Sequence, residues 1–97
     1  MGARKEEKVY QREIVLYTRS HYLNSWRAKR FLRYLGYHFD VIDTGRDPNV
    51  LVELSEAVQH KVSLPYIFVG ERPVGDLGVV RRLARTGILE HLVRGQL

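Results

Sequence analysis

The chain has 97 residues and a formal net charge of +5 at pH 7, with 44% hydrophobic and 28% charged residues. This length and composition are typical of one globular domain with a single core, and they exclude disordered and fibrous proteins. The absence of cysteine excludes disulfides, iron–sulfur clusters and thiolate–metal sites. No apolar run approaches the roughly 20 residues that span a bilayer and no signal-peptide pattern is present, so we expect a cytoplasmic protein without membrane contact.

The N-terminal residues are mostly charged and show no sustained hydrophobic period. This pattern indicates a flexible leader or an expression remnant over residues 1–12, followed by one packed domain over residues 13–97. The domain begins with residues 13–18, EIVLYT, a short apolar run typical of a strand that is covered on both faces.

A helix and a second strand follow. The helix is expected from Asn24 or Ser25 to about Leu35, because apolar residues recur at helical spacing and Gly36 then provides a C-terminal stop. Ser25 is placed to cap its first turn. Residues 37–44, YHFDVIDT, are rich in aromatic and β-branched residues and predict a strand.

A second helix starts in the segment GRDPNV. Asp47 is placed as its N-cap and Pro48 as its first residue, and the apolar pattern continues to about Gln59. Five residues at helical spacing are expected to form its apolar stripe: Val50, Leu51, Leu54, Ala57 and Val58.

The C-terminal part of the chain predicts a hairpin and a third helix. LPYIFVG gives a third strand after Pro65, ERP a tight turn and VGD a short fourth strand. The segment from Leu77 to Arg85 has the apolar spacing of a helix that Thr86 and Gly87 end, and ILEHLVRG predicts a last helical piece. Three arginines are expected on the solvated side of the third helix: Arg81, Arg82 and Arg85.

The predicted elements occur in the order β-α-β-α-β-β-α. A crossover that holds a helix makes the first two strands parallel, and the tight turn makes the last two antiparallel. We therefore expect an α/β protein of thioredoxin-like fold, with a four-stranded mixed sheet flanked by helices.

Three separated motifs are similar to those of glutaredoxins and occur in the same order. VLYTRSHYLNSWRAKRFL resembles the first strand, the CPYC-type site and the helix start of that family. YHFDVIDTGRDP resembles its second strand and the following turn, and VSLPYIFVGERPVGD resembles its TVPQIFIGGKHIGG segment. From about Ile14 to Gly95 the chain therefore resembles a glutaredoxin, in a variant that lacks the active-site cysteines.

The departures from the family pattern fall on its chemistry. By resemblance, Tyr22 stands where the family has its nucleophilic cysteine, and Ser25 where dithiol members have the resolving one. Neither replaces a thiolate, because the pKa of a tyrosine would have to fall from about 10 to about 7 for ionisation, and an oxygen does not exchange with disulfides. No catalytic residue is therefore predicted, and a role in cell redox homeostasis follows from the resemblance alone.

The resemblance also implies a ligand groove for glutathione or an extended peptide. Its expected lining comprises six residues, among which Leu64 and Pro65 match the family's backbone edge and cis-proline: Arg19, Tyr22, Leu64, Pro65, Gly75 and Asp76. The family's polar anchor on the third helix is replaced here by Gly78 or Val79, and Asp76 opposes an incoming carboxylate. We expect no cofactor and at most weak binding of glutathione.

A second candidate surface lies on the first helix, opposite its core side. Trp26 is followed at i+3, i+4 and i+7 by cations on the same face: Lys29, Arg30 and Arg33. One interpretation is that this face binds an unknown protein or peptide, in preference to nucleic acid. The other is that Trp26 and a neighbouring cation form only a cation–π contact within the helix, which contributes about 0.5–1 kcal/mol. The four histidines form no metal-binding pattern: His21, His38, His60 and His91.

Three functions remain open. The favoured one is a monomeric glutaredoxin-like binding or regulatory module without redox-active thiols, which keeps a remnant glutathione or peptide groove. The second is a glutathione-dependent or other small-molecule transferase that uses Tyr22 or Ser25, for which the sequence offers only His21 as a nearby base. The third is a basic nucleic-acid-binding domain, whose only sign is the positive net charge.

Overall fold

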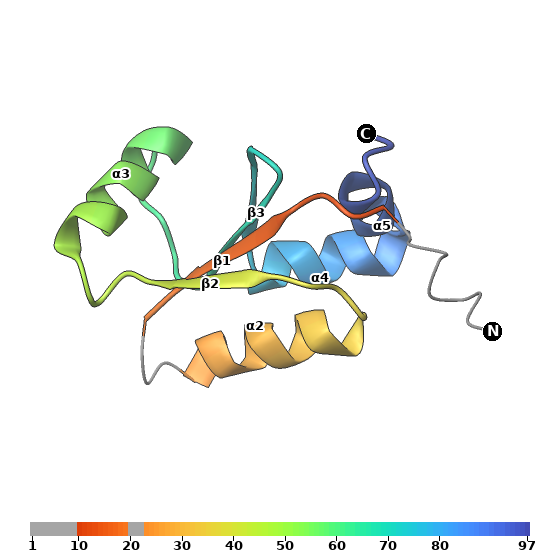
Figure 1. Cartoon of the computed structure of the whole chain (residues 1–97), viewed down its shortest axis with the longest axis horizontal. Helices are drawn as coiled ribbons and strands as arrows, with labels where there is room; N and C mark the ends of the chain where they lie inside the picture. Colours follow the sequence, from red (N-terminus) through yellow and green to blue (C-terminus); the bar gives the residue numbers. More distant parts are fainter. Residues whose placement is uncertain (1–9, 20–22) are drawn as a thin grey trace.

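The computed structural model of the chain describes residues 10–19 and 23–97, and its centre is a four-stranded sheet in the order β2–β1–β3–β4 (Figure 1). β1 (Ile14–Thr18) pairs in parallel with β2 (Asp40–Asp43) and antiparallel with β3 (Tyr66–Val69). β3 pairs antiparallel with β4 (Arg72–Asp76). The mixed sheet and the predicted order of the elements are confirmed.

Helices follow the strands at nearly the predicted positions. They are α2 (Leu23–Tyr34), α3 (Pro48–Val58), α4 (Leu77–Thr86) and α5 (Ile88–Val93). Asp47 caps α3 as predicted, because its side chain accepts a hydrogen bond from the Asn49 N–H at 3.0 Å. In the described part of the chain, no helix is both long enough and apolar enough to cross a membrane.

β2 and β4 differ from the predicted strands by more than one residue. β2 covers only Asp40–Asp43, rather than residues 37–44, because the backbone of Tyr37 returns to α2 and bonds the Leu32 carbonyl. β4 begins at Arg72 rather than Val74, since the hairpin turn occupies only Gly70 and Glu71. Pro73 is tolerated inside β4 because this strand forms the edge of the sheet.

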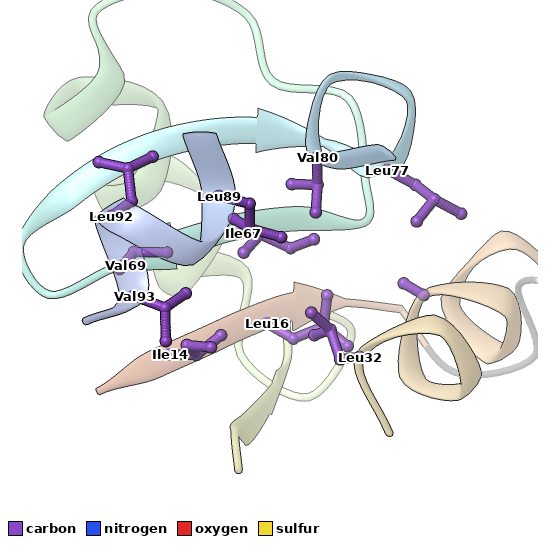
Figure 2. Close-up of a cluster of buried hydrophobic side chains, with 11 residues drawn as sticks. Ile14, Leu16, Leu32, Ile67, Val69, Leu77, Val80, Leu89, Leu92 and Val93 are labelled. Atoms are coloured by element: carbon purple, nitrogen blue, oxygen red, sulfur yellow. The ribbon is translucent and has the colours of Figure 1, made fainter. Parts of the chain in front are cut away.

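The core lies between one face of the sheet and helices α2, α4 and α5 (Figure 2). Alternate residues of the two central strands point into it, as the two-residue period of a strand requires. β1 contributes Ile14 and Leu16, and β3 contributes Ile67 and Val69. The helices contribute the rest: Ala28, Leu32, Leu77, Val80, Leu89, Leu92 and Val93.

Helix α3 packs more loosely than its apolar stripe predicts. Only Leu54 of the expected stripe is fully buried, and Ala57 is exposed. In Figure 1, α3 stands away from the strands instead of lying along them. Helical periodicity thus shows which face of α3 is apolar but not how much of that face another element covers.

The packed domain begins before residue 13. The Arg12 N–H donates to the Val93 carbonyl at 2.7 Å. The Gln11 side chain donates to the His38 carbonyl at 2.8 Å and accepts from the His38 N–H at 3.0 Å. The predicted boundary is therefore wrong at Gln11 and Arg12, since polar groups join them to the fold without a hydrophobic pattern. The prediction of a leader over residues 1–9 lies outside the described residues.

Candidate functional site

The junction between β1 and α2 is held by two hydroxyl groups. Ser25 is buried, and its hydroxyl accepts a hydrogen bond from Thr18 Oγ1 at the end of β1. The prediction that Ser25 caps the helix is wrong, because α2 begins two residues earlier, at Leu23. Ser25 instead ties the helix to the sheet. Tyr22, the other residue at a cysteine position of the resembling family, lies outside the described residues.

A cavity of about 410 Å³ lies between the first turns of α2, the loop before β3 and the start of α4. Its described lining comes from these three segments: Asn24 and Arg27 of α2, Ser63, Leu64 and Pro65 of the loop, and Asp76, Leu77, Gly78 and Arg81 at α4. Three of the predicted groove residues therefore meet here, namely Leu64, Pro65 and Asp76. Segments far apart in the sequence form this site because the sheet brings the ends of β1, β3 and β4 together.

Leu64 gives the cavity an open backbone edge. The Leu64–Pro65 peptide bond is cis, and β3 begins only at Tyr66. Among the residues that the structure describes, neither the amide nor the carbonyl of Leu64 has a hydrogen-bond partner. One donor and one acceptor are thus available to a ligand that lies along this edge.

In the turn from β4 into α4, Gly75 and Asp76 stabilise the fold: one allows close packing and the other caps α4. Asp76 accepts a hydrogen bond from the Val79 N–H at 3.1 Å and so caps α4. Gly75 has a φ of +145°, and a Cβ added to it would lie 2.9 Å from Val79 Cβ. Gly75 is buried and does not belong to the described lining of the cavity. Gly75 therefore does not contact the cavity. It contributes by having no side chain, which lets Val79 pack against β4.

The positive charge of the cavity comes from residues that the sequence analysis did not assign to it. Arg27 and Arg81 line the cavity, whereas Arg19 is not among its described lining residues. The Arg19 side chain passes near the loop after β2, since a Cβ added to Gly45 would lie 3.8 Å from Arg19 Cγ. The spacing of Asn24, Arg27 and Phe31 along one flank of α2 was the signal that could have revealed Arg27.

Arg81 joins α4 to α2. Its guanidinium carbon lies 5.6 Å from the centroid of the Phe31 ring, a cation–π contact between the two helices. Arg81 is exposed, as predicted, and it makes this contact with α2 in addition. Arg82 and Arg85 are exposed, as predicted.

A profile of the glutaredoxin family matches residues 14–74. The chain belongs to the glutaredoxin family. No curated protein sequence matches it. Among solved structures, the glutaredoxin of Brucella melitensis shares 30% sequence identity, with a TM-score of 0.76 over 90% of this chain and 95% of that one.

Two plant structures share the fold at lower identity. The buckwheat glutaredoxin–glutathione complex has a TM-score of 0.78 at 16% identity and covers 97% of this chain and 87% of that one. The wheat glutaredoxin has a TM-score of 0.77 at 19% identity, covering 98% of this chain and 90% of that one. This glutaredoxin therefore keeps the family's fold while it has no cysteine anywhere in its sequence.

The described lining of the cavity in this glutaredoxin carries two guanidinium groups and one carboxylate, that of Asp76, which is already hydrogen-bonded. Burial raises the pKa of the Tyr66 phenol, and the neighbouring Asp76 carboxylate raises it further, so Tyr66 is neutral at pH 7. The Asp76 carboxylate already accepts the Val79 N–H. The guanidinium groups of Arg27 and Arg81 therefore dominate the attraction of this site for a charged ligand.

The predicted partner face of α2 divides into two parts. Arg30 lies over the Trp26 ring, with 5.3 Å between the guanidinium carbon and the ring centroid. Arg33 turns instead to the Phe39 ring, 5.6 Å away, and Lys29 is half-buried. Trp26 remains 53% exposed despite its contact with Arg30, and Leu23 is 61% exposed. Leu23 and Trp26 thus give α2 exposed apolar surface at its N-terminal end, next to the cavity, and Tyr34 is exposed at its other end.

The described residues offer no obvious metal centre. Across residues 10–19 and 23–97, no three side chains of His, Cys, Asp or Glu gather as ligands of an ion would.

Proposed function

We propose that this glutaredoxin is a binding or regulatory module that does not carry out thiol–disulfide exchange. Its cavity between α2, the loop before β3 and α4 receives an extended peptide or a thiol compound such as glutathione. One observation carries the proposal: a chain without cysteine keeps the unpaired amide and carbonyl of Leu64 at the rim of the cavity. The proposal includes a cytoplasmic, monomeric protein that uses no cofactor.

A ligand in extended conformation would bind as a short added strand. Its backbone would accept from the Leu64 N–H and donate to the Leu64 carbonyl, which is the usual source of affinity when a peptide pairs with a strand edge. Arg27 and Arg81 would attract its carboxylates. The structure of the buckwheat relative contains glutathione, so this tripeptide is the first ligand to test.

Glutathione alone should bind weakly to this chain. The charge contacts available to it are solvent-exposed, and such a pair contributes about 0–1 kcal/mol. Association costs at least about 4 kcal/mol of lost freedom, which a few contacts of this size hardly offset. We therefore expect a dissociation constant weaker than millimolar.

The two other functions have less support. A transferase that uses Ser25 would need a free hydroxyl, but this hydroxyl is buried and accepts the hydrogen bond of Thr18. Tyr22 belongs to the part of the chain that is not described. The only feature that supports a nucleic-acid-binding function is the positive net charge.

Amide chemical shifts recorded by NMR during a titration with glutathione test the proposal. We expect gradual shifts of the Leu64 and Gly78 amides, and the same shifts with S-methylglutathione, because binding does not require a thiol. Arg81→Gln should reduce these shifts, whereas Arg82→Gln, which removes the same charge outside the cavity lining, should not. Unchanged Leu64 and Gly78 amides at tens of millimolar glutathione would rule out glutathione as a ligand of this groove.

A further inference from the structure

The helix that borders the cavity carries only positive charge. α2 contains Arg27, Lys29, Arg30 and Arg33 and no acidic residue. The ion pairs found between described residues are Arg46–Asp43 and Arg94–Glu90, and neither involves α2 or Arg81. Asp76 is the acidic residue of the described cavity lining, and it caps α4. The cavity therefore has more positive charge than the described residues around it neutralise.

Three of the arginines form a continuous track from α4 across α2. Arg81 stacks on Phe31, and Arg27 precedes Phe31 by four positions, so both guanidinium groups flank the same part of α2. Arg30 follows Arg27 by three positions and is its neighbour on the helix surface. We call Arg81, Arg27 and Arg30 the arginine track.

The track ends on exposed apolar surface. Arg30 covers one side of Trp26, and Leu23 lies one turn before Trp26 on the same flank of α2. Tryptophan and arginine are both enriched among the residues that dominate binding energy at protein interfaces. A ligand longer than a tripeptide could thus leave the cavity along the track and bury this apolar surface.

We propose that the ligand of this glutaredoxin is an acidic, extended polypeptide segment that pairs with the Leu64 edge, passes Arg81 and Arg27, and packs an apolar side chain against Trp26 beside Arg30. The inference rests on the proposed function and names the class of its ligand. The carboxylates of the segment would neutralise the arginine track. Its backbone would satisfy both free groups of Leu64.

A polypeptide fits these groups better than a nucleic acid does. Leu64 offers one donor and one acceptor, and a strand of polypeptide supplies both complements at the spacing of a sheet. A phosphodiester backbone presents acceptors to a protein and so leaves the Leu64 carbonyl unsatisfied. The Asp76 carboxylate within the cavity also disfavours a uniformly charged polyanion.

Isothermal titration calorimetry at low ionic strength with two capped peptides tests this inference. One peptide alternates glutamate with leucine, and the other alternates glutamine with leucine, so that they differ only in charge. We expect the glutamate peptide to bind about tenfold more tightly, since two or three exposed charge pairs contribute about that factor together. Trp26 is the single tryptophan of the chain, and its fluorescence should change when the glutamate peptide binds.

Variants that remove one charge each show whether the arginine track is responsible. Arg81→Gln and Arg27→Gln should each weaken binding of the glutamate peptide about threefold and leave the glutamine peptide unaffected. Arg82→Gln is the matched control and should bind the glutamate peptide like the unchanged protein. An equal loss in all three variants would contradict the track, because it would mean that only the net charge matters.

The remaining outcomes separate this inference from the proposed function. Equal affinity for the two peptides, or no binding of either while glutathione still shifts Leu64, overturns the acidic-peptide inference and leaves the groove intact. Binding of neither peptide, without any glutathione shift, overturns both. Tighter binding of single-stranded oligothymidylate than of the glutamate peptide, with a steep salt dependence, assigns the track to nucleic acid instead.

Discussion

Replacement of Gly75 by alanine should destabilise this glutaredoxin strongly. Gly75 precedes the residue that caps α4, and its φ of +145° lies in a region that residues with a side chain rarely adopt. An added Cβ would lie 2.9 Å from Val79 Cβ and 3.0 Å from Val79 Cγ1. Neither the backbone of β4 nor the first turn of α4 can move without disturbing the cap that Asp76 forms.

The expected loss follows from two contributions. The unfavourable backbone conformation costs about 1–3 kcal/mol, and the forced contact with Val79 costs a further 1–3 kcal/mol or so. The free energy of unfolding should therefore fall by about 2–6 kcal/mol, a large part of the roughly 5–15 kcal/mol that stabilises a small domain. In urea, where the slope is about 1–3 kcal/mol per molar for small proteins, the midpoint should fall by about 1 M or more.

Two controls make this prediction specific to Gly75. Gly78→Ala lies in the next turn without a positive φ, and its Cβ would meet Asp76 Oδ1 at 3.4 Å, so it should be neutral or stabilising by up to about 1 kcal/mol. Adding Val79→Ala to Gly75→Ala should recover part of the loss, because two of the clashing methyl groups disappear. A Gly75→Ala protein within about 0.5 kcal/mol of the unchanged one would refute the reasoning.

Four further predictions concern the junction of β1 and α2, the Tyr37–Glu90 pair and the absence of thiol chemistry. Ser25→Ala should lower the free energy of unfolding, measured in urea, by about 1 kcal/mol, because it removes the acceptor of Thr18 Oγ1. Ser63→Ala, at an exposed position, should leave the stability unchanged. Equal stability of the two variants would argue against a stabilising hydrogen bond between Thr18 and Ser25. Hydrogen bonds from Tyr37 and Arg94 lower the pKa of Glu90, so its stabilising effect should be complete above its unfolded value of 4.5 and be lost as the pH falls through the folded value. Glu90→Gln should therefore be less stable than the unchanged protein at pH 7 and converge with it in acid, and a constant difference in urea midpoints from pH 7 down to about pH 2 would contradict this assignment. Burial and the hydrogen bond to Glu90 raise the pKa of Tyr37 to about 12. The stabilising contribution of neutral Tyr37 should therefore be fully present below the ordinary pKa of 10 and be lost as the pH rises through about 12. Finally, glutathione-coupled reduction of a disulfide should not exceed the buffer blank, and turnover that disappears in Tyr22→Phe would show that an oxygen nucleophile is active after all.

The sequence predicts the fold well because local patterns determine most of it. The apolar spacing of the helices, the cap at Asp47 and the turn before β4 each specify one element, and the crossover and hairpin then specify how the strands pair. The packing of α3 could not be predicted in this way. Burial of its stripe depends on whether another element covers it, and only Leu54 is fully covered.

The candidate site was predictable only in part, for a similar reason. Leu64, Pro65 and Asp76 were found because they stand in motifs that resemble the family. Arg81 belongs to no such motif, and Arg27 stands in the first motif but was not assigned to the groove. The two residues meet only because α4 packs beside α2 and brings Arg81 over Phe31. In the chain, α2 and α4 are separated by three strands and α3, so their contact leaves no pattern in the local sequence.

Hydrogen exchange at the Leu64 amide, followed by NMR, tests the central claim most directly. This amide has no hydrogen-bond partner among the described residues, so it should exchange rapidly in the free protein. At saturation with the glutamate peptide its exchange should slow by at least about tenfold, because the amide then donates to the ligand backbone. The Glu71 amide in the hairpin turn should keep its rate. A peptide that saturates the protein while Leu64 exchanges as before would contradict the claim that this glutaredoxin binds its ligand by adding a strand to this edge.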